Sequence, residues 1–379
     1  MDLAYLSKTP GIGGILKSCP EDFIVEEISE KIKSNGDFSH FILKKTNWTT
    51  AKAIREVAKK LGIGIRKFGY AGNKDRTAVT TQICSVYRAE PSNLLSLKIK
   101  DIEILDAWKS KEPIKLGGLY GNRFKIKIKD LENEKNIKKI EKELNGKFPN
   151  YFGEQRFGST RKNTHIVGEL LLRKKYDEAV MEYLCNTEGE NNQDSVNARK
   201  ELRNSLDFKS ALINFPRYLS HERTLLDWLS KSPNDYVGSL RKLPKPILLL
   251  FIHAFQSYLF NLLVSERISE GKIKKEEGEF LCGINSYGFS DIEKKGKGLL
   301  AIKIIGTDSK LNSREKNILR KFSLTQEDFK IRGIPELTSK GTYRTLFAPL
   351  KDFKYSDNIF QFELPSGCYA TSAMREFIK

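Results

Sequence analysis

The sequence predicts an α+β protein in which a mixed or antiparallel sheet, formed by the two ends of the chain, is interrupted by a mainly helical middle. Three observations support this prediction. Residues 123–129 alternate basic and apolar side chains, as a strand with one buried face and one wet, basic face does. From about residue 164 to 270, apolar residues recur at helical spacing. Residues 359–364 alternate again, so a terminal strand can rejoin the first domain and make the middle an insertion.

The elements of the first part follow from local patterns. Strands are predicted at residues 20–28, 38–45, 66–71, 79–87 and 123–129. Residues 34–37, Ser-Asn-Gly-Asp, predict a hairpin turn between the first two strands, because Asn-Gly tolerates positive φ at both central positions. Thr50 is predicted to cap a helix that Gly62 ends, and a second helix at 137–144 is stopped by Gly146.

The middle and the end of the chain have their own signals. Helices are predicted at residues 166–172, 176–184, 224–229 and 247–267. The stretch 247–264 contains four polar side chains, so we favour a buried helix over a membrane span, which needs about 20 mostly apolar residues. The polar stretch 187–203 predicts a mobile loop. A strand is predicted at 299–305, and Ser372 is predicted to cap a short final helix.

The composition favours a phosphate-rich partner. The chain has 379 residues, more than one hydrophobic core usually spans, so two domains are expected. Its 66 Lys and Arg against 48 Asp and Glu give a net charge of +18. Each Lys or Arg that meets a phosphate releases condensed counterions, which makes nucleic acid the first partner to consider. The alternative is the solvated, Lys-rich surface of a heat-adapted protein.

The five cysteines and four histidines are scattered, and no two cysteines have the spacing of metal ligands. This pattern disfavours a zinc site and a disulfide framework, and it indicates a reducing compartment. Residues 1–10 contain no apolar signal core, so we expect a cytoplasmic protein. No dimerisation heptads are present, and we expect a monomer without an obligatory protein partner.

The run of residues 71–82, Ala-Gly-Asn-Lys-Asp-Arg-Thr-Ala-Val-Thr-Thr-Gln, is the most informative feature of the sequence. It places Asp75 between Lys74 and Arg76, shortly after Gly72, where a strand ends. Two flanking cations favour the ionised carboxylate, which can act as a nucleophile or a base. A glycine lets another chain approach closely. The alternative is a solvated turn.

A second run, residues 150–158, reads Asn-Tyr-Phe-Gly-Glu-Gln-Arg-Phe-Gly. Phe152 lies beside a glycine, and an aromatic side chain in that setting is a platform on which a base can stack. Asn150 and Gln155 can contact base edges or phosphates, and Arg156 can do either. The alternative is a β-bulge with packed aromatic residues.

Two further segments offer single candidates. Lys17 lies on a loop that leads into the first strand, after Gly13 and Gly14, where its cation can pair with a distant carboxylate. The glycines have neither the Walker spacing nor the G-x-G-x-x-G spacing of nucleotide-binding loops. Arg375 lies near the start of the final helix, where anions such as phosphate are favoured. A solvated lysine and a capped terminal helix are the alternatives.

Together these residues resemble the tRNA pseudouridine synthase D (TruD) family. The resemblance rests on 16–17 with 20–23, on 71–75 with Ala78 and Gln82, on 150–153 with Gly158, on 370–372 with 375–376, and more weakly on 254–261. It implies a pseudouridine-synthase-type catalytic domain, residues 1–158 and 346–379, around an inserted, mainly helical α+β domain, residues 159–345.

The resemblance also implies roles for the candidate residues. Asp75 is the expected catalytic aspartate, and Lys17 is the cation that pairs with it. Phe152 is the aromatic residue that packs on the flipped uridine, and Asn150 helps to position it. Lys74, Arg76, Gln155, Arg156 and Arg375 are predicted to contact RNA. The expected substrate is the uridine at position thirteen of certain tRNAs, and neither a cofactor nor a metal is expected.

The chemistry explains why these residue types are needed. A uridine must leave the base stack, which costs a few kcal/mol. Its bond from N1 to C1′ then breaks, the base turns, and C5 is joined to C1′. An ionised carboxylate can attack C1′ or remove the 2′ proton to give a glycal, and the sequence leaves both open.

Two alternative functions are a non-catalytic RNA-binding protein and another RNA-modifying enzyme, such as a methyltransferase. The cofactor pocket that a methyltransferase needs is not found in the sequence.

Overall fold

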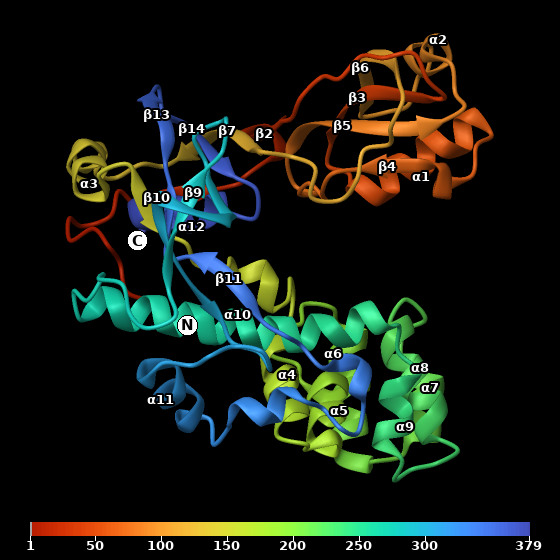
Figure 1. Cartoon of the computed structure of the whole chain (residues 1–379). Coiled ribbons are helices and arrows are strands. Elements are labelled where there is room, and N and C mark those ends of the chain that lie inside the picture. Colours follow the sequence, from red (N-terminus) through yellow and green to blue (C-terminus); the bar gives the residue numbers. More distant parts are fainter. Residues whose placement is uncertain (1) are drawn as a thin grey trace. The chain divides into compact units, whose positions relative to one another are not determined.

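The computed structural model describes residues 2–379, which form two compact units (Figure 1). The sheet unit comprises Leu6–Asn150, Ile284–Asp291 and Phe347–Lys379. The helical unit comprises residues 2–5, Tyr151–Gly283 and Ile292–Leu346. These bounds divide the chain into the two parts that are most compact in space. The predicted inserted domain, residues 159–345, was defined by resemblance to a family, and its bounds stay a prediction.

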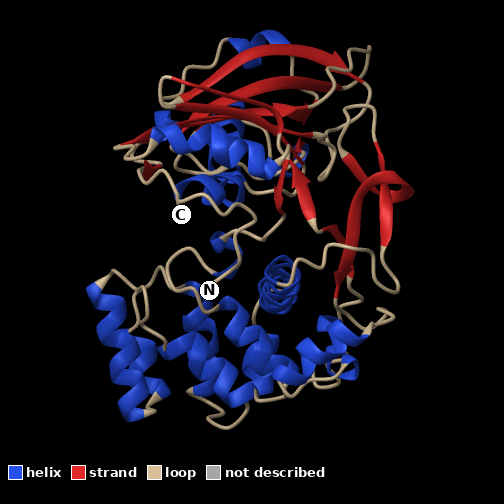
Figure 2. Cartoon of the chain, turned by 90° about the vertical axis from the view of Figure 1, so that its left-hand side faces the viewer, coloured by secondary structure: helices blue, strands red, loops and turns tan. Residues whose placement is uncertain are grey.

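Nine strands form the main sheet of the sheet unit (Figure 2). Seven lie in the order β13-β14-β7-β2-β5-β3-β6, while β1 pairs with β7 and β4 pairs with β5. Within this sheet the described pairs are antiparallel except β2 and β5, which are parallel. The sheet is therefore mixed, as predicted. Its strands are β1 Ile15–Leu16, β2 Phe23–Ile28, β3 Phe38–Thr46, β4 Phe68–Tyr70, β5 Val79–Tyr87, β6 Ile102–Ser110, β7 Gly121–Lys129, β13 Lys351–Ser356 and β14 Ile359–Pro365.

β7 carries the predicted alternation, and β14 completes its pairing. Phe124, Ile126 and Ile128 are buried, whereas the three lysines between and after them are exposed. β14 runs antiparallel to β7, from Ile359 beside Lys127 to Pro365 beside Gly121, so the terminal strand rejoins the first domain as predicted. The apolar faces of helices α3 (Ile137–Leu144) and α12 (Ala370–Ile378) lie in the same core. β8 (Lys147–Pro149) and β12 (Phe347–Pro349) form a small separate pair.

The prediction of a hairpin at residues 34–37 was wrong. β2 and β3 are not neighbours, because β5 lies between them and pairs with both. Gly36 instead lies close to the end of β6, where a Cβ atom would be 2.5 Å from the Ser110 carbonyl oxygen. The Asn-Gly signal coincides with a bend of the chain at residues 35–37, but it could not show which strand lies beside which.

Both predicted helix caps in this unit were displaced. Thr49, and not Thr50, caps α1 (Thr50–Leu61), and its hydroxyl oxygen accepts a hydrogen bond from the Lys52 amide at 3.3 Å. Gly62 ends α1 with a φ of 66°, as predicted. Ser372 lies inside α12, which is preceded by Tyr369 at the cap position. At α1 a neighbouring threonine satisfies the same sequence rule, whereas at α12 the cap position carries Tyr369, whose side chain makes no cap hydrogen bond. The rule is therefore accurate only to within a few residues.

The helical unit contains eight α-helices and a three-stranded sheet among its described residues. The sheet has the order β11-β10-β9, and its longer strands extend into the residues of the sheet unit. The helices of the helical unit are α4 Thr164–Leu172, α5 Tyr176–Cys185, α6 Gln193–Ser205, α7 Phe208–Asn214, α8 Ser220–Leu229, α9 Tyr236–Arg241, α10 Lys245–Ser269 and α11 Ser313–Lys321. The strands of its sheet are β9 Phe280–Ile284, β10 Ser290–Ile304 and β11 Thr342–Thr345. α2 (Pro91–Leu95) belongs to the sheet unit.

The predicted mobile loop at 187–203 is mostly the helix α6, so this prediction was wrong. Asn192 caps the helix by accepting a hydrogen bond from the Ser195 amide at 3.0 Å. Arg199 on α6 is 1% exposed and pairs with Glu222 on α8 at 2.8 Å. Arg161 binds the same carboxylate at 3.2 Å. The polar composition of this stretch predicted a loop, but its charged side chain Arg199 is buried in ion pairs that stabilise a helix.

α10 is a core helix of the helical unit. Among residues 2–379 it is the one helix that is long and apolar enough to cross a membrane, and 67% of its apolar window is buried. Several of its polar side chains have hydrogen-bond partners inside the protein. Gln256, for example, donates to the Ile305 carbonyl at 2.6 Å and accepts from Ser339 Oγ at 3.0 Å. A buried helix with satisfied polar groups agrees with the sequence prediction.

Candidate active site

Asp75 and Lys17 form an ion pair within the sheet unit. Lys17 follows β1 with a left-handed φ of 59°, and Asp75 lies in the loop between β4 and β5. Lys17 Nζ lies 2.5 Å from Asp75 Oδ2, and it also lies 3.8 Å from the centroid of the Phe23 ring. The Asp75 side chain is 33% exposed and that of Lys17 is 17% exposed. The carboxylate is therefore oriented by a cation while it remains accessible to solvent.

The loop that carries Asp75 is held by two buried polar side chains. Gln82 Nε2 donates to the Gly72 carbonyl at 3.0 Å, and Thr50 Oγ1 accepts from the Lys74 amide at 2.9 Å. Thr50 Oγ1 also donates to Gln82 Oε1 at 2.9 Å, so the two side chains act together. Both are almost completely buried, where satisfied hydrogen bonds fix a backbone more firmly than in water.

Lys74 and Arg76, the two cations beside Asp75, have different surroundings. The Lys74 side chain is 5% exposed, and its ammonium lies 2.9 Å from a Glu27 carboxylate oxygen and donates to Asn122 Oδ1 at 2.6 Å. Arg76 is exposed. The geometry gives Lys74 a structural position that does not favour the predicted RNA contact, since leaving a buried pair is costly. Arg76 remains able to meet a phosphate.

Phe152 is the centre of a second cluster, in the helical unit. Its backbone is held by Asn261 of α10, which accepts from the Phe152 amide at 2.8 Å and donates to the Phe152 carbonyl at 3.0 Å. The Phe152 ring meets Phe260 edge to face at 5.5 Å, and the Arg344 guanidinium lies 4.2 Å from its centroid. Phe152 is half-buried. An aromatic ring fixed in this way can serve as a stacking platform.

The remaining predicted residues are distributed over both units. Arg156 donates to Ser257 Oγ at 3.1 Å, and its guanidinium lies 5.8 Å from the Phe152 ring centroid. Gln155 is exposed, whereas Asn150, at the end of the sheet-unit segment, is 2% exposed. Arg375 lies 3.8 Å from the buried Glu376 carboxylate. The structure thus joins Lys17 to Asp75 and Arg156 to Phe152. A common site for these two clusters stays a prediction.

Two residues that contact these clusters, Lys45 and Arg344, were not predicted from the sequence. Lys45 donates to the Asp75 carbonyl at 2.8 Å. It falls on the same face of its strand as the buried Phe41 and Leu43, so an unexpected lysine at a core position was a usable signal. Arg344 lies almost two hundred residues from Phe152 in the sequence, and no local pattern points to it.

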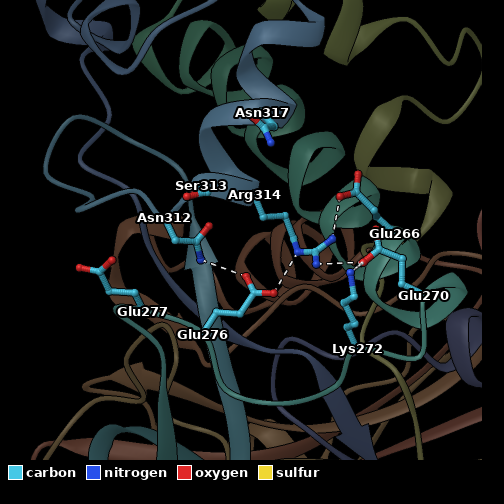
Figure 3. Close-up of a pocket in the computed structure, with 9 residues that line it drawn as sticks. All are labelled: Glu266, Glu270, Lys272, Glu276, Glu277, Asn312, Ser313, Arg314 and Asn317. Atoms are coloured by element: carbon cyan, nitrogen blue, oxygen red, sulfur yellow. Dashed lines mark hydrogen bonds and ion pairs between the residues drawn. The ribbon is translucent and has the colours of Figure 1, made fainter.

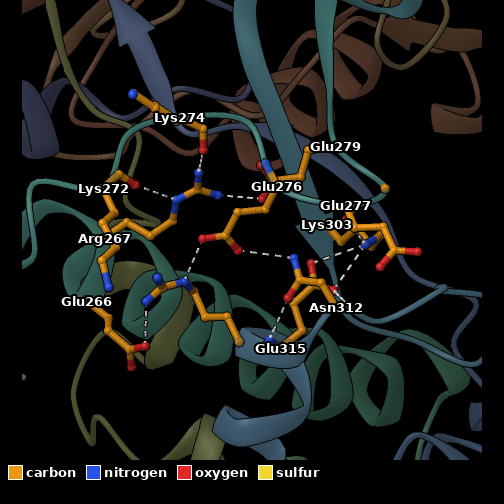
Figure 4. Close-up of polar contacts among 12 residues, drawn as sticks. Glu266, Arg267, Lys272, Lys274, Glu276, Glu277, Glu279, Lys303, Asn312 and Glu315 are labelled. Atoms are coloured by element: carbon orange, nitrogen blue, oxygen red, sulfur yellow. Dashed lines mark hydrogen bonds and ion pairs between the residues drawn. The ribbon is translucent and has the colours of Figure 1, made fainter.

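A separate cavity of about 510 Å³ lies in the helical unit between the end of α10 and α11 (Figure 3). Arg314 is bound there by three glutamates, Glu266, Glu270 and Glu276, at 2.7 to 3.0 Å. The hydrogen bond from Arg314 lowers the pKa of Glu270 to about 2. Two buried ion pairs, Arg267 with Glu279 and Lys303 with Glu315, lie beside it (Figure 4). Because its lining is acidic and internally paired, this cavity has the character of a structural ion-pair network.

No group of three or more His, Cys, Asp or Glu side chains is arranged to hold a metal ion within residues 2–379.

Comparison with known proteins places the whole chain in one family. The family model for tRNA pseudouridine synthase D (TruD) matches residues 2–377. The chain is 39% identical to a protein of Pyrococcus abyssi described as tRNA pseudouridine synthase D, over 100% of this chain and 99% of that protein. The corresponding protein of Pyrococcus furiosus is 38% identical, over 100% and 98% of the two chains.

A solved structure agrees with this assignment. The crystal structure of the protein from Methanosarcina mazei described as tRNA pseudouridine synthase D superimposes with a TM-score of 0.81 at 30% sequence identity, covering 99% of this chain and 95% of that one. The mixed sheet with its helical partner is therefore the fold of that protein as well. The chain belongs to the tRNA pseudouridine synthase D (TruD) family, whose members are isomerases that act on tRNA.

Proposed function

We propose that the protein converts one uridine of tRNA, the uridine at position thirteen, into pseudouridine without a cofactor, with Asp75 as its catalytic carboxylate. The observation that carries this proposal is the ion pair between Lys17 and Asp75 in a loop fixed by buried hydrogen bonds. Family membership supports the reaction and the RNA class. The cytoplasm is the proposed compartment, and a monomer is the proposed state.

Two features of the Asp75 loop support this role. Its carboxylate is accessible, and a Cβ atom at nearby Gly72 would meet only the Leu119 side chain, at 3.8 Å. A ribose can therefore approach the loop closely. The carboxylate then attacks C1′, or it removes the 2′ proton to give a glycal, as the bond from N1 to C1′ breaks. After the base turns, C5 bonds to C1′. In the first route the bond between Asp75 and C1′ breaks as C5 attacks, and in the second the proton held by Asp75 returns to C2′. The C5 proton then leaves and N1 gains a proton, so the product is an isomer of the substrate and Asp75 is regenerated.

Lys17 and Phe152 have supporting roles in this proposal. The Lys17 ammonium pairs with the Asp75 carboxylate and fixes its direction. Phe152 stacks on the flipped base, and stacking without hydrogen bonds lets the base turn. The RNA is bound by the wet, basic face of β7 and by four polar or charged side chains, Arg76, Gln155, Arg156 and Arg375. Asn150 acts from a buried position, by shaping the start of the segment that carries Phe152.

Truncation of Phe152 to Ala is expected to weaken productive binding of the flipped base by about 1–3 kcal/mol, the usual range for loss of one base–aromatic stack. The measurement is the rate of pseudouridine formation at limiting RNA concentration. Phe152→Leu is the control, because it keeps most of the volume but not the aromatic face. If Phe152→Leu were as active as the unaltered protein, Phe152 would be a packing residue.

Affinity for tRNA is expected to fall steeply with salt. A protein that neutralises about six phosphates loses about 10³-fold in affinity between 50 and 200 mM salt. Titration of labelled tRNA at several salt concentrations gives the slope. Arg76→Gln should reduce that slope by about one, whereas Lys74→Gln should leave it unchanged, because Lys74 is buried against Glu27. A flat salt response would contradict a broad phosphate interface.

The direct test is incubation of the purified protein with unmodified tRNA transcripts, without added cofactor or metal, followed by site-resolved mapping of pseudouridine. Pseudouridine at position thirteen is the expected result. Pseudouridine only at another tRNA position would correct the site but keep the reaction. Tight, salt-dependent binding without product across a tRNA panel would favour a non-catalytic RNA-binding protein.

A further inference from the structure

Lys45 is a buried lysine directly behind the candidate catalytic carboxylate. It lies near the end of β3, a strand in the interior of the sheet, paired with Thr80 of β5 on one side and with Ile102 of β6 on the other. It is 1% exposed. Its ammonium donates to the Asp75 carbonyl oxygen at 2.8 Å and to the Trp48 carbonyl oxygen at 2.5 Å.

Burial of the Lys45 ammonium costs free energy, because the charge loses its contact with water. The groups that compensate for this loss indicate the role of Lys45. Burial lowers the pKa of Lys45 to about 8, against the opposing effect of the Asp75 charge. A buried charge is tolerated where charge-assisted hydrogen bonds compensate for lost water. For Lys45, the described acceptors within residues 2–379 are two backbone carbonyls, and one of them belongs to Asp75.

Asp75 is consequently held at two points. Lys17 fixes the carboxylate, and Lys45 fixes the backbone carbonyl of the same residue to a strand paired on both sides. The hydrogen bonds of Gln82 and Thr50 hold the preceding residues of the loop, but neither contacts Asp75 itself. Reacting groups perform best when they are held within about 0.5 Å by rigid elements.

We propose that Lys45 is a positioning residue, which anchors the backbone of Asp75 to β3 and thereby sets the direction of its carboxylate. This inference rests on the proposed function of Asp75, and it adds a residue that never touches the substrate. Its loss should lower the rate of the chemical step while leaving the affinity for tRNA unchanged.

Lys45→Met tests this proposal, because Met keeps the length and the apolar stem but cannot donate. The rate of a single turnover at saturating tRNA should fall about 10- to 100-fold, in line with the effect of small misplacements of a reacting group, while the Kd for tRNA stays the same. Lys303→Met is the matched control. Lys303 is a 2% exposed lysine in the helical unit, paired with Glu315 at 3.1 Å, and its loss should not change the rate per folded molecule.

Hydrogen exchange of the peptide containing residues 72–78 gives a readout that needs no activity. Lys45→Met should accelerate exchange there and Lys303→Met should not. If Lys45→Met fails to fold, Lys45→Gln, which keeps a shorter donor, takes its place. Unchanged exchange with an unchanged single-turnover rate would overturn the proposal, as would a loss confined to tRNA affinity. If the unaltered protein makes no pseudouridine, the proposed function fails, and the exchange experiment alone decides whether Lys45 anchors the loop.

Discussion

Replacement of Asp75 by Asn is expected to abolish pseudouridine formation while the protein still folds and binds tRNA. The amide has nearly the same shape and can still accept a hydrogen bond from Lys17, so the loop should keep its conformation. It cannot attack C1′ or take a proton, so the rate should fall by about 10⁴-fold, the upper range for a positioned acid–base group. The measurement is single-turnover pseudouridine formation at saturating tRNA, with a parallel measurement of tRNA affinity.

Asp106→Asn is the matched control. Asp106 is a half-exposed carboxylate on β6 of the same sheet, and it too lies near a lysine, with Lys31 Nζ at 3.4 Å. Its replacement should leave the rate within experimental error. Appreciable turnover by Asp75→Asn would remove Asp75 from the mechanism, whereas loss of both folding and binding would show that its role is structural.

Replacement of Glu222 by Ala is expected to cause the largest loss of stability. Glu222 is the carboxylate between two buried guanidinium groups, at 2.8 Å from Arg199 and 3.2 Å from Arg161. Burial, followed by the neighbouring Arg199 charge, already lowers the pKa of Arg161. Without Glu222 the two cations lose the carboxylate that they share, while a second carboxylate, Glu190, lies only within 3.8 Å of Arg199. Removal of one partner from a buried pair costs about 3–5 kcal/mol.

Thermal unfolding followed by circular dichroism measures this loss. A decrease in melting temperature of about 10 °C corresponds to that free energy for a unit of this size. Asp227→Ala on the same helix is the control, because Asp227 pairs with Lys231 on the surface, at 2.8 Å, and such pairs contribute about 0.3–0.5 kcal/mol. Equal effects of the two substitutions would contradict the importance of the buried cluster.

Elements with one dry and one wet face could be predicted from the sequence. The bounds of α3 match the predicted residues, and the alternation in β7 identified its buried face. In these segments local periodicity and tertiary burial agree, and the pattern alone decides the structure. The failures occurred where pairing partners are distant. No local signal placed β5 between β2 and β3, and α6 is held by charges buried in the tertiary structure.

The candidate site also contains residues that the sequence predicted and one whose surroundings it could not predict. Motif resemblance identified Lys17 and Asp75, which are 58 residues apart and form an ion pair in the structure. Lys74 looked equivalent to Arg76 in the sequence, yet it is buried against Glu27. A charged residue's neighbours in space decide whether it reaches solvent, and sequence adjacency to Asp75 could not reveal this for Lys74.

The crossing of the chain between units has a consequence for synthesis. The chain passes from one unit to the other after residues 5, 150, 283, 291 and 346. β7 ends at Lys129, and its partner β14 begins at Ile359, which is 359 − 129 = 230 positions later in the chain. At about 5–20 residues per second, a nascent chain presents one unpaired side of β7 for roughly 10–50 s. An open strand edge is a template for wrong pairing, and slow translation or truncation before residue 359 should therefore favour aggregation of the newly made protein.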